Sequence, residues 1–322
     1  MLKIKDLQVN QIVTIPLVVL SATARETKSK KPYLALSLYD GTDTISGNYW
    51  DWAGVNIPAK STILNVRAQV TEWQGVTQLN ISGLTTNTEL SLAEFMPKSN
   101  HDVAETYRNA YALISDVKDD FLRCLTLDLL EALQGEWLTV PGAKGVHHAY
   151  LAGTLIHSYS VATIAKAIAL QTPGANVDLC IVGGMLHDLG KLFTYQLDGV
   201  TIGMTDEGML YDHLFMGAEF VGNFADNNYT LDETSTCKWE MLRHIILSHH
   251  GKHEQGAVVT PMSIEAHIVY HADSVDAVAE QVREYSAKAG QAKFTDRIWT
   301  LENRPHLTTQ YVAGVMESQS EK

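Results

Sequence analysis

The sequence has few cysteines and no long apolar run. Its three cysteines, Cys124, Cys180 and Cys237, stand more than 50 residues apart and form no CxxC pair, which argues against disulfides and against cysteine zinc ligands. No uncharged apolar run approaches the ~18 residues that a membrane helix needs. Charges such as Lys3 and Lys5 interrupt the segment where a signal peptide would place its apolar core. These absences predict a cytoplasmic protein that does not act at a membrane.

The composition is that of an ordinary globular protein, but its charge is unevenly distributed. Of the 322 residues 45% are apolar and 19% are charged, and the length predicts two domains. Residues 1–90 hold 8 Lys and Arg against 7 Asp and Glu, whereas residues 91–322 hold 16 against 30. An acidic domain repels polyanions unless bound cations reverse its field, so a phosphate substrate would favour bound metal ions.

The N-terminal region has the alternating pattern of half-buried strands. Apolar residues recur at every second position in segments 13–19, 34–38, 64–70 and 79–81, separated by charged or turn-rich stretches. About five short strands within some 80 residues fit a small barrel of the oligonucleotide/oligosaccharide-binding (OB) type. A small β-sandwich is the alternative that this pattern leaves open.

After residue 90 the apolar pattern becomes helical. Helices are expected at about 101–116, 118–134, 147–171, 177–188, 205–225, 233–249 and 263–288. The predicted fold class is therefore a five-stranded OB-type β-barrel followed by an all-α helical bundle. The predicted domains are the barrel at 1–90, a helical linker region at 91–145, the bundle at 146–290 and a C-terminal tail at 291–322.

Histidines and aspartates recur on or beside the apolar helices of the second region. A single buried histidine is more often a satisfied core residue than a ligand, but an ordered set is a stronger signal. The set comprises His157, His187, Asp188, His213, His249 and Asp273. Neutral imidazole with carboxylate suits Mn, Fe, Co, Ni or Zn better than Mg or Ca. The set suffices for two divalent ions about 3.5–4 Å apart, a spacing that clamps a phosphoryl group.

This ordered set resembles the HD superfamily of metal-dependent phosphohydrolases. The dyad extends to the HDxGK form of that superfamily, His187-Asp188-Leu189-Gly190-Lys191. The chain also resembles the YhaM family of bacterial 3′-to-5′ exoribonucleases, which join an N-terminal OB barrel to a C-terminal HD domain. The further matching segments, which with these cover most of residues 10–280, are Lys31-Pro32-Tyr33-Leu34, Pro141-Gly142-Ala143-Lys144, His147-His148-Ala149-Tyr150, Ile246-Leu247-Ser248-His249-His250-Gly251 and Tyr270-His271-Ala272-Asp273.

The resemblance implies a division of the ligands between two ions. One ion would be held by His157, His187, Asp188 and Asp273. The second would be held by His213 and His249, with Asp188 bridging the pair. Two divalent ions per HD site are therefore expected, with Mn or Co preferred and Fe, Ni, Zn or Mg as the other candidates.

Two further residues are predicted to take part in catalysis beside Asp188. Lys191 lies three residues after Asp188, and its ammonium group could neutralise a phosphate oxygen in the transition state. A solvated Lys191 is the alternative. His250 cannot easily face the same ion as its neighbour His249, so it is expected to support a ligand, to donate a proton to the leaving oxygen or to be structural.

Several residues are predicted to contact nucleic acid. In the barrel they are Lys28, Lys30 and Lys31 of a basic loop, together with Tyr33, because stacking and backbone charge hold single strands. Before the first ligand helix they are Lys144, His147 and His148, which could touch substrate phosphates. For the aromatic residues of the barrel a core position is the alternative, and for the second group an ordinary helix-start turn.

The leading hypothesis is a metal-dependent 3′-to-5′ exoribonuclease that hydrolyses single-stranded RNA, or single-stranded DNA, to 5′-nucleotides. A phosphodiesterase acting on short oligonucleotides, cyclic dinucleotides or nucleotides is the first alternative, favoured by the acidity of the second region. A non-catalytic nucleic-acid-binding protein with structural metals is the second, and a two-iron oxygenase is the most distant. A homo-oligomer is also expected, since a strand-binding barrel gains avidity by assembly.

Overall fold

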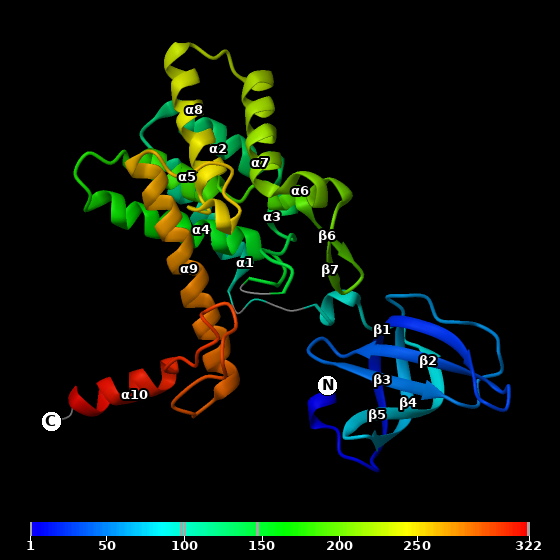
Figure 1. Ribbon diagram of the computed structural model, residues 1–322. Helices are drawn as coiled ribbons and strands as arrows, with labels where there is room; N and C mark the ends of the chain where they lie inside the picture. The colour runs from blue at the N-terminus through cyan, green and yellow to red at the C-terminus, as the bar shows by residue number, and fades with distance from the viewer. Residues whose placement is uncertain (1, 97–98, 100, 146–147, 321–322) are drawn as a thin grey trace. The chain divides into compact units, whose positions relative to one another are not determined.

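The structure, a computed structural model, describes residues 2–96, 99, 101–145 and 148–320. The chain divides into two compact units. The first is Met1–Lys98 with Leu197–Thr201, and the second is Ser99–Gln196 with Ile202–Lys322. Each unit is described by itself below (Figure 1).

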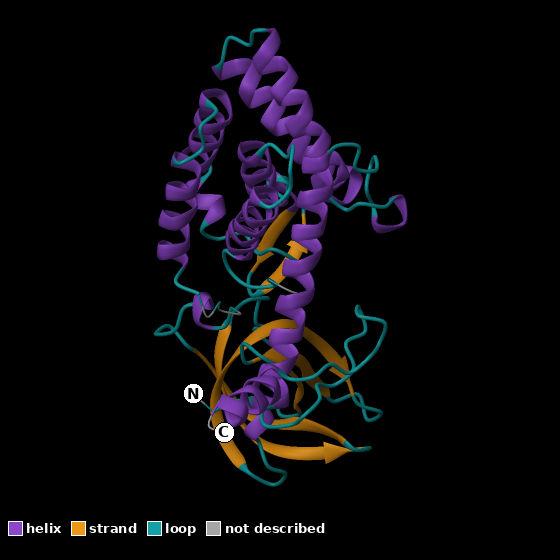
Figure 2. Ribbon diagram, turned by 90° about the vertical axis from the view of Figure 1, so that its left-hand side faces the viewer, coloured by secondary structure: helices purple, strands orange, loops and turns teal. Residues whose placement is uncertain are grey.

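The first unit is a closed five-stranded barrel, which confirms the predicted barrel and excludes the sandwich. Neighbouring strands follow the order β1-β2-β3-β5-β4, and only the β3–β5 pairing is parallel. The strands are β1 (Ile12–Glu26), β2 (Pro32–Tyr39), β3 (Thr44–Tyr49), β4 (Ile63–Trp73) and β5 (Val76–Thr86). Figure 2 shows these strands, in orange, curving around one another.

Alternation along the strands builds the barrel core. In β2, Leu34, Leu36 and Leu38 are buried while their neighbours are partly exposed, as the period-two pattern predicts. The register of β1 shifts between Val19 and Ser21, so that this long strand bends and pairs with β4 along one half and with β2 along the other. The shift lets a single strand close the barrel.

A buried carboxylate fastens the turn between β2 and β3. Asp40 accepts hydrogen bonds from the backbone N–H groups of Ile4, Thr42 and Asp43 at 2.6–2.8 Å. Burial alone would raise its pKa, but these bonds outweigh burial and lower the pKa below the usual 3.8. Asp40 therefore joins the N-terminal segment to the barrel through its ionised form.

The second unit is mainly helical. Its helices are α1 (Val103–Ser115), α2 (Asp120–Ala132), α3 (Gln134–Trp137), α4 (Gly153–Leu170), α5 (Val177–Leu186), α6 (Lys191–Thr194), α7 (Asp206–Asn228), α8 (Glu233–Ser248), α9 (Ile264–Ala289) and α10 (Thr309–Ser320). Side chains of the residues Asp102, Asp119, Asn176, Thr205, Asp232 and Ser263 accept a backbone N–H at six of the helix starts. Residues next to each of these helices therefore determine where the helix begins.

The two most apolar helices lie at the centre of this unit. Every residue of α5 from Leu179 to Leu186 is buried, and α4 buries side chains on most of its circumference. A helix that is apolar all round must be covered on all sides, and Figure 1 shows α1, α2, α8 and α9 beside α4 and α5. A Cβ on Gly184 of α5 would lie 2.7 Å from Cα of Ala162 in α4, so glycine permits their close crossing.

The structure differs from the predicted elements in two places. The helix predicted from residue 147 begins only at Gly153. Between α6 and α7 the chain forms a two-stranded sheet of β6 (Tyr195–Asp198) and β7 (Thr201–Met204), which was not predicted and of which Leu197–Thr201 belong to the first unit. No helix among the described residues is long and apolar enough to cross a membrane.

Candidate metal centre

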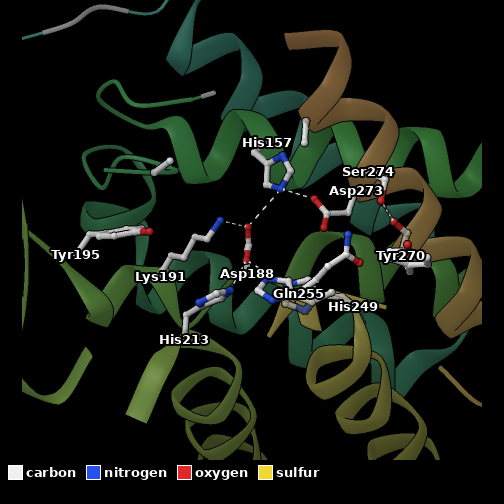
Figure 3. A pocket seen from close by; sticks show the side chains of 13 residues that line it. His157, Asp188, Lys191, Tyr195, His213, His249, Gln255, Tyr270, Asp273 and Ser274 are labelled. Atoms are coloured by element: carbon white, nitrogen blue, oxygen red, sulfur yellow. Dashed lines mark hydrogen bonds and ion pairs between the residues drawn. The ribbon is translucent and has the colours of Figure 1, made fainter. Parts of the chain in front are cut away.

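The ordered histidines and aspartates converge in the helical unit. They are supplied by α4 (His157), the turn after α5 (His187, Asp188), α7 (His213), the end of α8 (His249) and α9 (Asp273). The aspartate of the dyad is almost completely buried, and histidine nitrogens surround both of its oxygens. Figure 3 shows His157, Asp188, His213, His249 and Asp273 of this set.

A glycine sets the distance between the dyad turn and α7. Gly190 has a helix-like φ of −58°, so its role is not conformational. A Cβ built on Gly190 would lie 2.7 Å from the backbone nitrogen of Gly217 and 2.8 Å from the carbonyl carbon of His213, closer than real Cβ atoms approach. Only glycine therefore lets α7 approach the turn and bring His213 to the dyad.

A kink in α7 aims His213 at the same point. Asp212 interrupts the helix with φ 62° and ψ 158°, a conformation that L-residues rarely adopt and that costs free energy. The kink allows Oδ1 of Asp212 to accept hydrogen bonds from both the backbone N–H and the Nδ1–H of His213. The other ring nitrogen of His213 is thereby turned toward Asp188.

Asp188 occupies the centre of the site. Its Oδ2 lies 3.3 Å from Nε2 of His157 and 3.4 Å from Nε2 of His187. Its Oδ1 lies 3.3 Å from Nε2 of His213 and 3.5 Å from Nε2 of His249. The two carboxylate oxygens thus face two different pairs of imidazoles, which is the geometry required of a bridging ligand.

All four imidazoles present Nε2 toward the centre because Nδ1 is held elsewhere. In His187 and His249, Nδ1 lies 2.8 Å from a backbone carbonyl, which can only accept a hydrogen bond, so Nδ1 carries the proton. In His157 and His213, Nδ1 contacts a carboxylate in the same way. A neutral ring with Nδ1 protonated keeps its lone pair on Nε2, which is the metal-binding state.

The residues present fit a metal ion. Among the described residues, Oδ1 of Asp188 and Nε2 of both His213 and His249 are buried with no hydrogen-bond partner. Buried polar groups without a hydrogen-bond partner are costly, and a bound cation would satisfy all three. Donor atoms 3.0–3.4 Å apart are expected around an ion whose bonds are about 2.1 Å long. Two distances fall in this range. Nε2 of His157 lies 3.2 Å from Nε2 of His187 and 3.2 Å from Oδ1 of Asp273.

The structure adds His250 to the second imidazole pair. Ligand atoms of His213, His249 and His250 all lie within 4.8 Å of one another, and Nδ1 of His250 is buried without a hydrogen-bond partner among the described residues. The spacing therefore permits His249 and His250 to face one ion, and the role of His250 stays a prediction. The chain turns where α8 ends, so that both imidazoles face α7.

Burial and neighbouring charges set the protonation state of the site. Burial alone would raise the pKa of Asp188, but Lys191 and His187 lower it well below 3.8. For Asp273 the contact with His157 likewise outweighs burial and lowers the pKa. Burial, followed by the charges of the two neighbouring histidines, lowers the pKa of His250 to about 3. At pH 7 the site offers ionised carboxylates and a neutral His250, which are the forms that bind metals.

Lys191 lies inside the site and not in solvent. Its ammonium group is 2.6 Å from Oδ2 of Asp188, and its side chain is only 12% exposed. Burial would lower the pKa of Lys191, but the charge of Asp188 outweighs burial and raises it. The lysine therefore keeps a positive charge at the centre, and the alternative of a solvated Lys191 is wrong.

The metal centre opens into a pocket of about 340 Å³. Besides the central residues, its wall includes Ala143, Tyr195, His250, Gln255, Tyr270, Ser274 and Ala277. Figure 3 shows Tyr195 and Tyr270 on opposite sides of Asp188. The volume is at the small end of the range for ligand pockets.

The residues predicted to bind nucleic acid in the barrel lie near one another on one surface. Lys28 and Lys30 are exposed in the β1–β2 loop, and Lys31 forms a 2.8 Å ion pair with Asp51. The ring of Tyr33 is half-buried, with its centroid 4.4 Å from that of Trp50. These aromatic rings are thus not part of the barrel core.

The three residues before α4 do not share one environment. Lys144 is exposed beside Ala143 of the pocket wall, and His147 lies outside the described residues. His148 is only 2% exposed, and both of its ring nitrogens are within 2.8 Å of Tyr150 or Asp276. The structure therefore places the His148 ring in the interior and not where a substrate phosphate could contact it.

Two functional contacts were missed by reasoning from the sequence. Asp276 holds Nδ1 of His157 at 2.7 Å, and Asp212 holds that of His213. The spacing of three residues between Asp273 and Asp276 places both on one helix face, a signal that was available. The contact of Asp212 depends on the kink in α7, and no local pattern marks that kink.

Comparison with known proteins identifies the central part of the helical unit. The family model of the HD domain matches residues 154–278, a segment that contains all six converging residues. The chain thus consists of a five-stranded OB-like barrel followed by a helical unit that contains an HD domain.

Two solved structures are similar to parts of the chain. The second OB-fold domain of replication protein A from Methanococcus maripaludis is 23% identical, with 28% of this chain and 96% of that chain covered and a TM-score of 0.23. The HD domain of the L. monocytogenes phosphodiesterase PgpH is 22% identical, with 48% of this chain and 73% of that chain covered and a TM-score of 0.30.

Proposed function

We propose that the protein is a metal-dependent phosphohydrolase whose active centre is built around Asp188. The observation that carries this proposal is the placement of Asp188, with one carboxylate oxygen facing His157 and His187 and the other facing His213 and His249. This is the arrangement that a carboxylate bridging two cations requires.

The ligands divide into two groups. One divalent ion would be held by His157, His187, Asp273 and one oxygen of Asp188. The second would be held by the other oxygen of Asp188 and the three remaining imidazoles, His213, His249 and His250. Nitrogen-rich sites of this kind suit Mn or Co, and also Fe, Ni or Zn, better than Mg.

The protein side chains supply orientation and charge in the proposed reaction. Bound divalent ions would act as Lewis acids toward a phosphoryl oxygen and lower the pKa of water. An ammonium group has three donors, and Asp188 takes one donor of Lys191. The other two can face a phosphate oxygen in the pocket and stabilise the charge that develops there. Tyr195 and Tyr270 form opposite walls that limit the position of the substrate.

As substrate we propose single-stranded RNA, hydrolysed from the 3′ end to 5′-nucleotides. The exposed Lys28 and Lys30, with the neighbouring rings of Tyr33 and Trp50, support strand binding by the barrel. The pocket of about 340 Å³ beside the proposed metal ions is at the small end of ligand pockets, which supports attack at the end of a strand. Single-stranded DNA has the same backbone charge and stacking surfaces and is the obvious comparison substrate.

The central test is hydrolysis by Asp188→Ala. Single-stranded RNA labelled at its 3′ end is incubated with wild type and variant in Mn²⁺ or Co²⁺, and the products are separated by size. We expect a labelled mononucleotide from the earliest times with wild type, and no detectable product with the variant. Asp120→Ala is the matched control, because the Asp120 side chain is 87% exposed on α2. Undiminished hydrolysis by the Asp188 variant would refute the proposal.

A second candidate is a phosphodiesterase for short oligonucleotides, cyclic dinucleotides or nucleotides. The excess of acidic residues after position 90 favours it, because a short ligand needs no long basic track. Rates measured against oligomer length discriminate the two. A rate that peaks at two or three nucleotides supports the second candidate, whereas a rate that rises with length until the barrel is occupied supports the first.

Two other possibilities are tested by the same material. If wild type binds metal and RNA but hydrolyses neither RNA nor short nucleotides, the protein is a binding protein with structural metals. The expected homo-oligomer stays a prediction, which light scattering of the purified full chain would test. The expected cytoplasmic location also stays a prediction.

A further inference from the structure

A buried carboxylate lies directly behind the metal ligand His157. Oδ2 of Asp276 is 2.7 Å from Nδ1 of His157 and 2.8 Å from Nε2 of His148. The hydroxyl of Ser160 donates to the other oxygen of the same carboxylate. Asp276 therefore joins a residue of the metal centre to a residue outside it.

The hydrogen bonds fix the protonation of both rings. A carboxylate oxygen only accepts, so both His157 and His148 donate to Asp276. His148 is then left with Nδ1 as an acceptor, and the hydroxyl of Tyr150 lies 2.7 Å from it. The proton on Nδ1 of His157 places the lone pair of the ring on Nε2, the atom that faces Asp188 and Asp273.

The backbone around His148 is shaped to keep its ring in the interior. His148 has φ 59°, in the left-handed region that residues other than glycine seldom adopt. Its carbonyl accepts a 2.9 Å hydrogen bond from the N–H of Gly142. A Cβ on Gly142 would lie 2.8 Å from Cβ of His148, and one on Gly153 would lie 3.0 Å from its carbonyl carbon. The buried position of the His148 ring thus depends on two glycines and on a strained backbone at His148 itself. A side chain that only filled space would not need this backbone.

We propose that Asp276 and His148 are positioning residues for the metal ion held by His157. Asp276 would lock the His157 ring and increase the electron density on Nε2, and His148 would hold the Asp276 carboxylate in place. The inference rests on the proposed two-metal function. If this proposal holds, the segment before α4 affects metal affinity through His148. The same segment supplies Ala143 of the pocket wall.

The experiment measures metal binding directly. Full-length wild type, Asp276→Asn and His148→Gln are stripped of metal with a chelator and titrated with Mn²⁺ in a calorimeter. Asp119→Asn is the matched control, because Asp119 also accepts a backbone hydrogen bond and pairs with a side chain, that of Lys238, but contacts none of the proposed ligands. We expect wild type and control to bind two equivalents with unchanged affinity.

The variants should weaken one ion and not the other. Asp276→Asn is expected to weaken one of the two sites about 10–100-fold and to leave the second within roughly twofold of wild type. His148→Gln should weaken the same site by a smaller factor. At saturating Mn²⁺, kcat should recover while the Mn²⁺ concentration for half-maximal rate rises, whereas general damage to the fold would lower kcat at every concentration.

The possible failures are distinguishable. If both variants bind both ions as tightly as wild type, or lose both ions equally while folded, the positioning role is refuted. If Asp276→Asn lacks wild-type circular dichroism, His148→Gln decides alone. If wild type itself binds no Mn²⁺, the proposed two-metal function fails first.

Discussion

Replacing Gly190 by alanine tests whether close packing of the dyad turn against α7 positions the second half of the metal centre. The backbone at Gly190 has φ −58°, which alanine adopts freely, so the variant changes packing alone. The added Cβ would lie 2.8 Å from the carbonyl carbon of His213, whereas ordinary contact begins at 3.4 Å. The carbonyl oxygen of His213 would lie closer still, so α7 must retreat by at least about 0.6 Å, more than the ±0.2 Å that metal–ligand distances tolerate.

The expected result is a loss of metal binding on the His213 side of Asp188. Overpacking should cost about 1–3 kcal/mol, which for a unit of this size lowers the Tm by roughly 2–12 °C. Mn²⁺ titration of the metal-free protein should show one of two sites weakened, and thermal unfolding should report the loss of stability. Gly135→Ala is the control, since nothing lies within 4 Å of its Cβ position. A Gly190→Ala protein that keeps both sites at wild-type affinity would show that the geometry does not depend on this contact.

The remaining predictions concern charge and stacking. Lys191→Met, which removes the ammonium group beside Asp188, should lower kcat by about 10²–10³ at saturating metal, and steady-state kinetics with kcat unchanged would contradict its role. Trp50→Ala should weaken binding of single-stranded RNA by about 1–3 kcal/mol without changing the metal content, and an unaltered Kd in a filter-binding assay would remove Trp50 from the interface. Asp40→Asn should destabilise the barrel at pH 7. Because the folded-state pKa of Asp40 is lowered, its contribution is fully present above the unfolded value of 3.8 and is lost as the pH falls through the folded pKa. The difference in thermal stability between wild type and Asp40→Asn should thus shrink below pH 3.8, and a constant difference would show that the charge is not responsible.

Much of the secondary structure could be predicted from local patterns. Alternating leucines such as Leu34, Leu36 and Leu38 identify β2, because one face of each strand must be buried. The start of α4 could not be predicted in this way. The apolar pattern continues upstream of Gly153, but the left-handed backbone of His148 interrupts any helix there, and tertiary hydrogen bonds hold that conformation in place. The β6–β7 hairpin was missed for a simpler reason, since its strands have only four residues each.

The same distinction applies to the candidate site. The dyad of His187 and Asp188, with the glycine and lysine that follow, can be recognised because its members are neighbours in sequence. A role for His250 was predicted, but its closeness to the ligand atoms of both His213 and His249 was not, because it depends on how the chain turns after α8 relative to α7. The surface of the barrel could be predicted in part. Its lysines are evident in the sequence, but the contact of Tyr33 with Trp50 is not.

The sequence by itself determined which side chains are available and in what order, because strand and helix periodicity, capping residues and the imidazole–carboxylate set are local properties. The tertiary structure alone decided which oxygen of Asp188 faces which imidazoles, which ring nitrogen is free and which carboxylates stand behind the ligands. The physical reason is that most of these relations join α4, the dyad turn, α7 and α9, which lie far apart in the chain. Their separation is set by close backbone contacts, such as that of Gly190 with Gly217, and not by any local preference.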